Sequence, residues 1–139
     1  MKMSEQKLID LAEDFALFED WEDRYRYLID LGRLVPNMEN SLKTEQNKVR
    51  GCTSQVWLVA EWRDGRLYFE ADSDAQIIRG LIHILGMAYQ GRTKAEIDQF
   101  NIAKTFEDLG LDRHLSPNRR NGFFAMVERI RGLDYPASA

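Results

Sequence analysis

The sequence predicts an α+β fold in which a three-stranded antiparallel sheet packs against helices. Two segments typical of strands, 55–63 and 66–72, flank Asp64-Gly65, a dipeptide favoured in two-residue hairpin turns. The segment 77–89 is apolar on nearly all sides, which is typical of a buried central helix. With 139 residues, the chain is long enough to bury a real core and too short to favour a second domain. We therefore expect a single domain over residues 1–139.

Two helices are expected before the sheet. Ser4 can cap the first, whose apolar residues follow three- and four-residue spacing as far as Phe18. Asp20 opens the second, and Gly32 is expected to end it in the left-handed conformation before Pro36. The following polar segment has no periodicity and should be an exposed loop that leads into a short third strand at 48–50.

The hairpin turn determines which strand residues face each other. If Arg63 pairs with Arg66, one face of the hairpin is wholly apolar, formed by the pairs Trp62–Leu67, Ala60–Phe69 and Leu58–Ala71. Because a two-stranded hairpin is marginally stable alone, this face must pack against helices.

Start signals mark the helices that follow the hairpin. The expected helices are 77–89 after a capping box at Ser73, short pieces at 97–100 and 103–109 after a second box at Thr93, and a last helix from Ser116-Pro117. The helix 77–89 should be the most buried of them, because little of its surface is polar.

Composition excludes several classes of function. A net charge of -4 argues against a nucleic-acid partner, which would require a basic surface. The most apolar stretch, 77–89, contains Arg79 and His83 and is shorter than the roughly 18 residues of a membrane span. The first residues lack the apolar block of a signal peptide, so we expect a cytoplasmic protein without membrane contact.

Charge is distributed unevenly along the chain. Residues 1–30 hold nine acids against four bases, whereas residues 113–131 hold five arginines against Glu128. A bipolar surface suits a protein partner, and solvated helix faces without a binding role are the alternative.

Cys52 is the only cysteine of the chain and the main candidate for chemistry. It lies between the short strand and the hairpin, next to Gly51, which permits a tight turn. Lys48 and Arg50 precede it, and no acid lies between Glu45 and Glu61, so the local field should favour the thiolate. A single thiol and two histidines cannot supply a cysteine-rich metal site, and we expect no bound metal or cofactor.

Other catalytic arrangements lack their partners. A hydrolytic cysteine requires a histidine base, but His83 lies on the apolar helix and His114 has no recognisable motif around it. A dithiol redox cycle within one chain requires a second cysteine.

Three blocks of sequence carry a family resemblance: Gly51-Cys52-Thr53-Ser54-Gln55-Val56-Trp57, Asp72-Ser73-Asp74-Ala75 with Arg79-Gly80-Leu81, and His114-Leu115-Ser116-Pro117-Asn118-Arg119 with Gly122. In this order they resemble the SufE family of sulfur-acceptor proteins (SufE/CsdE-like cysteine desulfuration proteins). The resemblance extends from the Trp21 helix to the last helix. Asn118 departs from the pattern, in which a small hydroxyl residue is expected before the arginine.

The resemblance implies both fold and function. The family fold is a small α/β sandwich shared with iron–sulfur scaffolds of the IscU type. Cys52 would accept persulfide sulfur from a pyridoxal-phosphate-dependent cysteine desulfurase of the SufS/CsdA type, stimulate that enzyme, and relay the sulfur to an iron–sulfur scaffold. Pyridoxal phosphate would belong to the desulfurase, and this chain would be an accessory protein, not itself an enzyme.

If Cys52 carries a persulfide, we expect supporting roles for several other residues. Gly51 would act as a hinge, and Thr53, Ser54 and Gln55 would supply hydrogen bonds to the loop. Arg119, together with Asp74 and His114, would contribute to partner binding. We expect Cys52 to be largely buried in the free protein, because a persulfide is easily lost to small thiols.

Two other functions and one assembly remain as alternatives. The chain could be a partner-binding regulator with a structural cysteine, or a one-cysteine thiol-transfer or redox enzyme. The sequence is also compatible with a homodimer.

Overall fold

The computed structural model describes residues 2–51 and 54–133. Within these residues the elements are α1 (Lys2–Ala16), α2 (Trp21–Gly32), the 3-10 helix η1 (Asn40–Leu42), β1 (Val56–Arg63), β2 (Arg66–Ser73), α3 (Gln76–Tyr89), α4 (Lys94–Gln99), α5 (Ile102–Asp108), α6 (Leu111–His114) and α7 (Pro117–Arg131). Helices and an antiparallel hairpin share one core, so the α+β class is confirmed.

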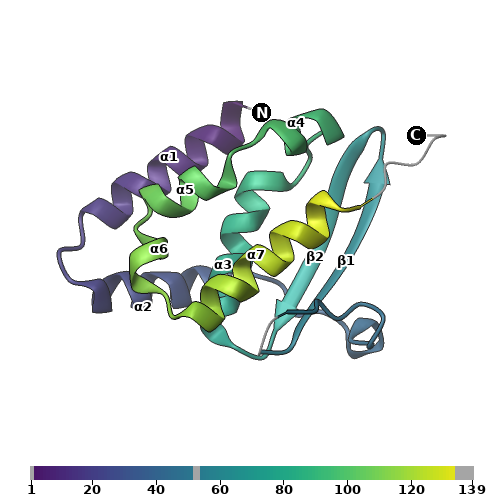
Figure 1. Cartoon of the computed structure of the whole chain (residues 1–139), viewed down its shortest axis with the longest axis horizontal. Helices are drawn as coiled ribbons and strands as arrows, with labels where there is room; N and C mark the ends of the chain where they lie inside the picture. The colour runs from purple at the N-terminus through teal and green to yellow at the C-terminus, as the bar shows by residue number, and fades with distance from the viewer. Residues whose placement is uncertain (1, 52–53, 134–139) are drawn as a thin grey trace.

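Helix α3 occupies the centre of the fold. In Figure 1 it lies between the β1–β2 hairpin on one side and the helices α1, α2, α5 and α6 on the other, and α7 passes alongside it. It packs against α1, α2, β2 and α7. Leu81, Leu85, Ala88 and Tyr89 have no exposed surface. The expectation that 77–89 is a buried central helix is confirmed.

The predicted register of the hairpin is correct. Arg63 pairs with Arg66, and the apolar pairs between Leu58 and Ala71 and between Ala60 and Phe69 lie on the same face. The turn residues Asp64 and Gly65 have φ values of 52° and 75°, as a type I′ turn requires.

The third strand is not confirmed: the described sheet has two strands. The segment 47–49 makes only an isolated bridge, between Lys48 and Trp57, supported by hydrogen bonds from Val49 N to Val56 O and from Leu58 N to Asn47 O. A turn precedes this segment and Gly51 follows it, so it is too short to form a full ladder.

Two local expectations around α2 and α1 were wrong. Gly32 is the last residue of α2 but is not left-handed, and the C-cap that follows it, Arg33, is right-handed with φ at -69°. A Cβ on Gly32 would lie 2.9 Å from the amide nitrogen of Gly80, so the glycine serves the close crossing of α2 and α3. Ser4 lies inside α1, which begins at Lys2, and is not its cap.

The capping box expected at Ser73 is also absent. Ser73 is the last residue of β2, and Ala75 occupies the N-cap of α3 without a side-chain hydrogen bond. The Ser73 hydroxyl instead accepts from the amide of Ala75 at 3.1 Å, in a short turn between strand and helix.

The remaining start signals agree with the structure. Thr93 and Glu96 form the capping box of α4, the Ser116 hydroxyl accepts from the amide of Arg119, and Asp20 occupies the N-cap of α2. Helix α6 is an additional short helix between α5 and α7. Among the described residues, no helix is long and apolar enough to cross a membrane.

Candidate functional site

The segment that carries the predicted sulfur site joins the bridge at Lys48 to β1. Cys52 and Thr53 themselves lie outside the described residues, so their predicted burial and contacts stay predictions. The amide of Val49 donates to Val56 O at 2.8 Å and closes a connection of six residues, 50–55, which we call the cysteine loop. Gly51 is exposed with φ at 89°, a conformation that residues with a side chain rarely adopt.

The end of the cysteine loop is attached to the turn between β2 and α3. The Ser73 hydroxyl donates to Gln55 O at 2.7 Å, and the Asp74 carboxylate accepts from the amide of Gln55 at 3.2 Å. Gln55 therefore takes part through its backbone, and Ser73 and Asp74 supply the side-chain groups. Ser54, beside it, is half-buried and lies in a bend.

The segment before the cysteine loop is attached to helix α7. The guanidinium of Arg129 donates to Lys48 O at 3.2 Å and to Gln46 O at 3.3 Å. One turn earlier on the same face of α7, the Ala125 methyl would lie 3.6 Å from a Cβ placed on Gly51. Both ends of the loop are thus held by side chains from elements distant in sequence.

The positive field expected from Lys48 and Arg50 is partly neutralised. Glu45 Oε2 lies 3.5 Å from the Arg50 guanidinium, and Glu45 Oε1 lies 3.9 Å from Lys48 Nζ. The turn at 45–47 brings the Glu45 carboxylate toward Lys48 and Arg50. The positions of these residues along the sequence did not reveal this contact. All three groups are at least partly solvated, so the residual field is weak.

A buried carboxylate supports the strand end that holds the loop. Asp72 is 2% exposed, accepts from the amides of Met38 at 2.9 Å and Ser73 at 2.8 Å, and pairs with Arg79. Burial alone would raise the pKa of Asp72, but these amides, with the charges of Arg79 and Lys43, bring it below the ordinary value. Asp72 is therefore ionised at neutral pH and fixes the backbone next to Ser73 and Asp74.

The third sequence block lies against helix α2. Arg119 donates to the Tyr25 hydroxyl at 3.2 Å and stands over its ring, and that hydroxyl donates to His114 O at 3.3 Å. The His114 ring stacks on Trp21, with centroids 4.2 Å apart. We call Trp21, Tyr25, His114 and Arg119 the Tyr25 cluster; Arg119 and His114 are exposed in it.

The structure thus separates the predicted partner-binding residues into two groups. Asp74 belongs to the cysteine loop, and Arg119 and His114 belong to the Tyr25 cluster. Among the described residues no hydrogen bond or ring contact links the two groups. The prediction from sequence missed Ser73, Ala125 and Arg129 as loop supports. The excess of arginine in 113–131 indicated that α7 is important, but it did not single out Arg129, which holds the segment before the cysteine loop.

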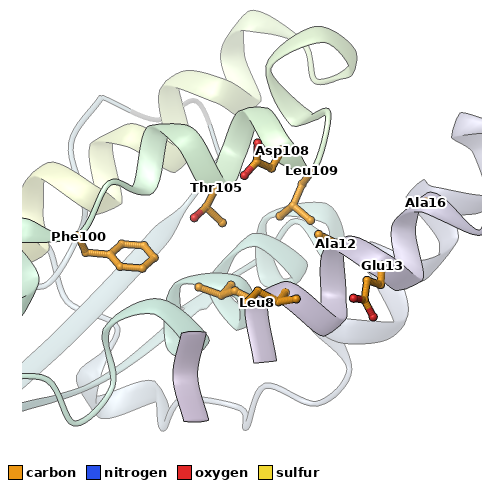
Figure 2. Close-up of a pocket in the computed structure, with 9 residues that line it drawn as sticks. Leu8, Ala12, Glu13, Ala16, Phe100, Thr105, Asp108 and Leu109 are labelled. Carbon is orange, nitrogen blue, oxygen red and sulfur yellow. The ribbon is translucent and has the colours of Figure 1, made fainter. Parts of the chain in front are cut away.

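An apolar groove lies elsewhere, between α1 and α5 (Figure 2). Its volume is about 440 Å³, and it is lined mainly by apolar side chains, with Glu13 and Asp108 at its rim. The site residues expected from the sequence are not among its lining. No group of three or more potential metal ligands occurs within residues 2–51 and 54–133.

Comparisons with known proteins identify the family of the chain. Residues 9–133 match the family model SufE, described as an Fe-S metabolism associated domain. The chain is 43% identical over 125 residues to an uncharacterized SufE-like protein of Rhizobium meliloti, covering 87% of this chain and 89% of that protein. A second SufE-like protein, from Rhizobium etli, is also 43% identical over 125 residues and is covered to 84%.

A solved structure shows the same fold. The solution structure of a hypothetical protein from Thermus thermophilus superimposes with a TM-score of 0.70 at 19% identity, covering 90% of each chain.

Proposed function

Because this chain belongs to the SufE family of domains associated with Fe–S metabolism, we propose that it is a sulfur acceptor for a cysteine desulfurase, with Cys52 as the carrier. The observation that carries the proposal is the position of the only cysteine. It follows the left-handed Gly51 in a short loop whose two ends are held by Ser73, Asp74 and Arg129. A lone thiol on a short loop suits exchange with a partner, because this chain has no second cysteine with which it could form a disulfide.

The proposed reaction is a transpersulfuration. The Cys52 thiolate attacks the terminal sulfur of the desulfurase persulfide, and the bond between the two sulfurs of that persulfide breaks. A new sulfur–sulfur bond forms on Cys52, and the desulfurase cysteine leaves as a thiolate. The proton of the persulfide stays with the transferred sulfur or exchanges with water, so no oxidant or reductant is consumed.

The reaction makes few demands on this chain. Pyridoxal phosphate acts in the desulfurase, where it releases sulfur from free cysteine, and this chain supplies a reactive thiolate and a surface for docking. The Cys52 persulfide would then pass its sulfur to an iron–sulfur scaffold, which frees Cys52 for the next transfer. Removal of sulfur from the desulfurase explains why its turnover would rise.

The Tyr25 cluster is the proposed docking surface. It presents an exposed arginine and a histidine ring stacked on Trp21, and Arg119 is oriented by the Tyr25 hydroxyl. An acidic group on the desulfurase could pair with Arg119, since a guanidinium binds a carboxylate in a fixed geometry.

Intact mass spectrometry tests the proposal. The protein is incubated with a cysteine desulfurase, cysteine and a persulfide-trapping alkylator, and we expect a labelled species that carries one additional sulfur. Cys52→Ser should fold, gain no sulfur and fail to stimulate the desulfurase, because serine is nearly the same size but cannot form a persulfide.

Two outcomes would contradict sulfur transfer. Full stimulation by Cys52→Ser would indicate a regulator with a structural cysteine. Turnover of a disulfide without any desulfurase would indicate a thiol-transfer enzyme.

A further inference from the structure

Arg129 makes contacts that neither the sequence blocks nor the family match assigns to it. Its side chain is half-buried on α7, and its two terminal nitrogens donate to two different carbonyls, Lys48 O and Gln46 O. A guanidinium can hold two acceptors at once because its donors are fixed in a plane. These carbonyls belong to a segment 81 and 83 residues away in sequence, so the contact is tertiary.

The two carbonyls lie in the turn at 45–47 and in the short segment after it, which has β1 on one side and no described strand on the other. Asn47 O accepts from the amide of Leu58 in β1, whereas Lys48 O, the next along the chain, accepts from Arg129. Successive carbonyls of an extended segment point in opposite directions, so one faces β1 and the other faces away from it. Arg129 therefore supplies the donor that a further strand would supply, and it covers an otherwise open edge.

The same face of α7 contacts the loop a second time. Ala125 lies four residues before Arg129, and its methyl group is close to Gly51. Gly51 immediately precedes Cys52. Helix α7 thus holds the chain at Gln46 and Lys48 and lies close to it at Gly51, just before the cysteine.

We propose that Arg129 is a positioning residue for sulfur transfer: by holding Gln46 and Lys48 against α7, it fixes the direction from which the chain enters the cysteine loop. This inference rests on the proposed function of Cys52, and it concerns how the thiol is presented and not how the partner is bound. We call these two hydrogen bonds of Arg129 the clamp. Without the clamp the cysteine loop samples more conformations, and a smaller fraction of them presents the thiol for attack. The transfer step then slows while docking is preserved.

Two variants and one control separate the contributions of Arg129. Arg129→Ala removes both donors, and Arg129→Lys keeps the charge but offers one nitrogen in place of two. Arg131→Ala is the matched control, because Arg131 lies on the same helix and donates to Asp98 O, away from the cysteine loop.

The first measurement is single-turnover sulfur transfer from a persulfidated desulfurase, followed at increasing desulfurase concentrations. For Arg129→Ala we expect a maximal rate about tenfold lower with an unchanged half-saturating concentration, and for Arg129→Lys an intermediate rate. Arg131→Ala should behave as the unaltered protein. An unchanged maximal rate for Arg129→Ala would overturn the proposal. So would a change confined to the half-saturating concentration, or a maximal rate for Arg129→Lys equal to that of the unaltered protein.

The second measurement is amide hydrogen exchange, which does not depend on sulfur transfer. The amides of Val49 and Leu58 should exchange about fivefold faster in Arg129→Ala, while those of α3 remain unchanged. Equal exchange at Val49 and Leu58 would overturn the clamp. If the unaltered protein accepts no sulfur but the exchange result holds, the proposed function fails and the clamp stands.

Discussion

Gly32 of α2 and Gly80 of α3 meet where the two helices cross. A Cβ on Gly32 would lie 2.9 Å from the Gly80 nitrogen, and a Cβ on Gly80 would overlap the carbonyl oxygen of Leu28. Both obstacles are backbone atoms, which cannot move aside as a side chain can. The absence of side chains at these positions lets α2 approach the central helix closely, next to Arg79, whose Nε donates to Gly32 O at 3.3 Å.

Gly80→Ala should therefore destabilise the protein, although alanine favours helix formation. Overpacking against the Leu28 carbonyl should cost about 3 kcal/mol of unfolding free energy. Gly86→Ala is the control, because it lies in the same helix and its Cβ would meet only Gln90 Cγ, at 3.8 Å. That change should stabilise the protein by roughly 0.5 to 1 kcal/mol. Urea unfolding of both variants measures the difference, and equal stabilities would contradict the crossing argument.

Replacement of Asp72 should weaken the turn that holds the cysteine loop. Asp72→Asn leaves Arg79 without its buried counter-charge and should cost about 3 kcal/mol of unfolding free energy. The native pKa of Asp72 is lowered, so its contribution is present above the ordinary value of 3.8 and is lost as the pH falls through the lower native value. The free energy of unfolding, measured against pH, should fall at acid pH in the unaltered protein and depend less on pH in Asp72→Asn. Parallel profiles would contradict it.

His83 should produce a separate dependence at higher pH. Burial on α3, and secondarily the charge of Lys7, hold the pKa of His83 below 6.5. The unfolded chain then binds a proton more readily than the folded one, so stability falls as the pH drops below 6.5. His83→Gln should remove this decline below pH 6.5, and Lys7→Gln should reduce it. Thermal unfolding across this range checks both variants, and an unchanged decline in His83→Gln would exclude His83 as its source.

Arg119 provides a test of the Tyr25 cluster as the docking surface. Arg119→Ala should weaken desulfurase binding about fivefold without unfolding the domain, since exposed charges at an interface contribute modestly. Arg33→Ala is a suitable control, because Arg33 is also exposed, caps the C-terminus of α2 and forms an ion pair with Asp30 of that helix. Binding titrations with both variants should separate them. Equal affinities would remove Arg119 from the docking surface.

The sequence by itself determined the features that depend on local spacing. The register of the hairpin follows from the two-residue turn and the alternation of apolar residues, and the burial of 77–89 follows from its composition. The sequence blocks likewise identified the family, which the comparisons confirm, and pointed to Cys52 as the carrier, which stays a prediction.

Only the tertiary structure decided which distant groups meet. The expected third strand is only a bridge at Lys48. Gly32 lies at the crossing of α2 and α3, and Glu45 forms an ion pair with Arg50. Of the five arginines of 113–131, it is Arg129 whose guanidinium holds the segment before the cysteine loop, at Lys48 and Gln46. Such contacts depend on the phase and docking of α7 against a segment some eighty residues earlier, and no local pattern in a single sequence encodes that geometry.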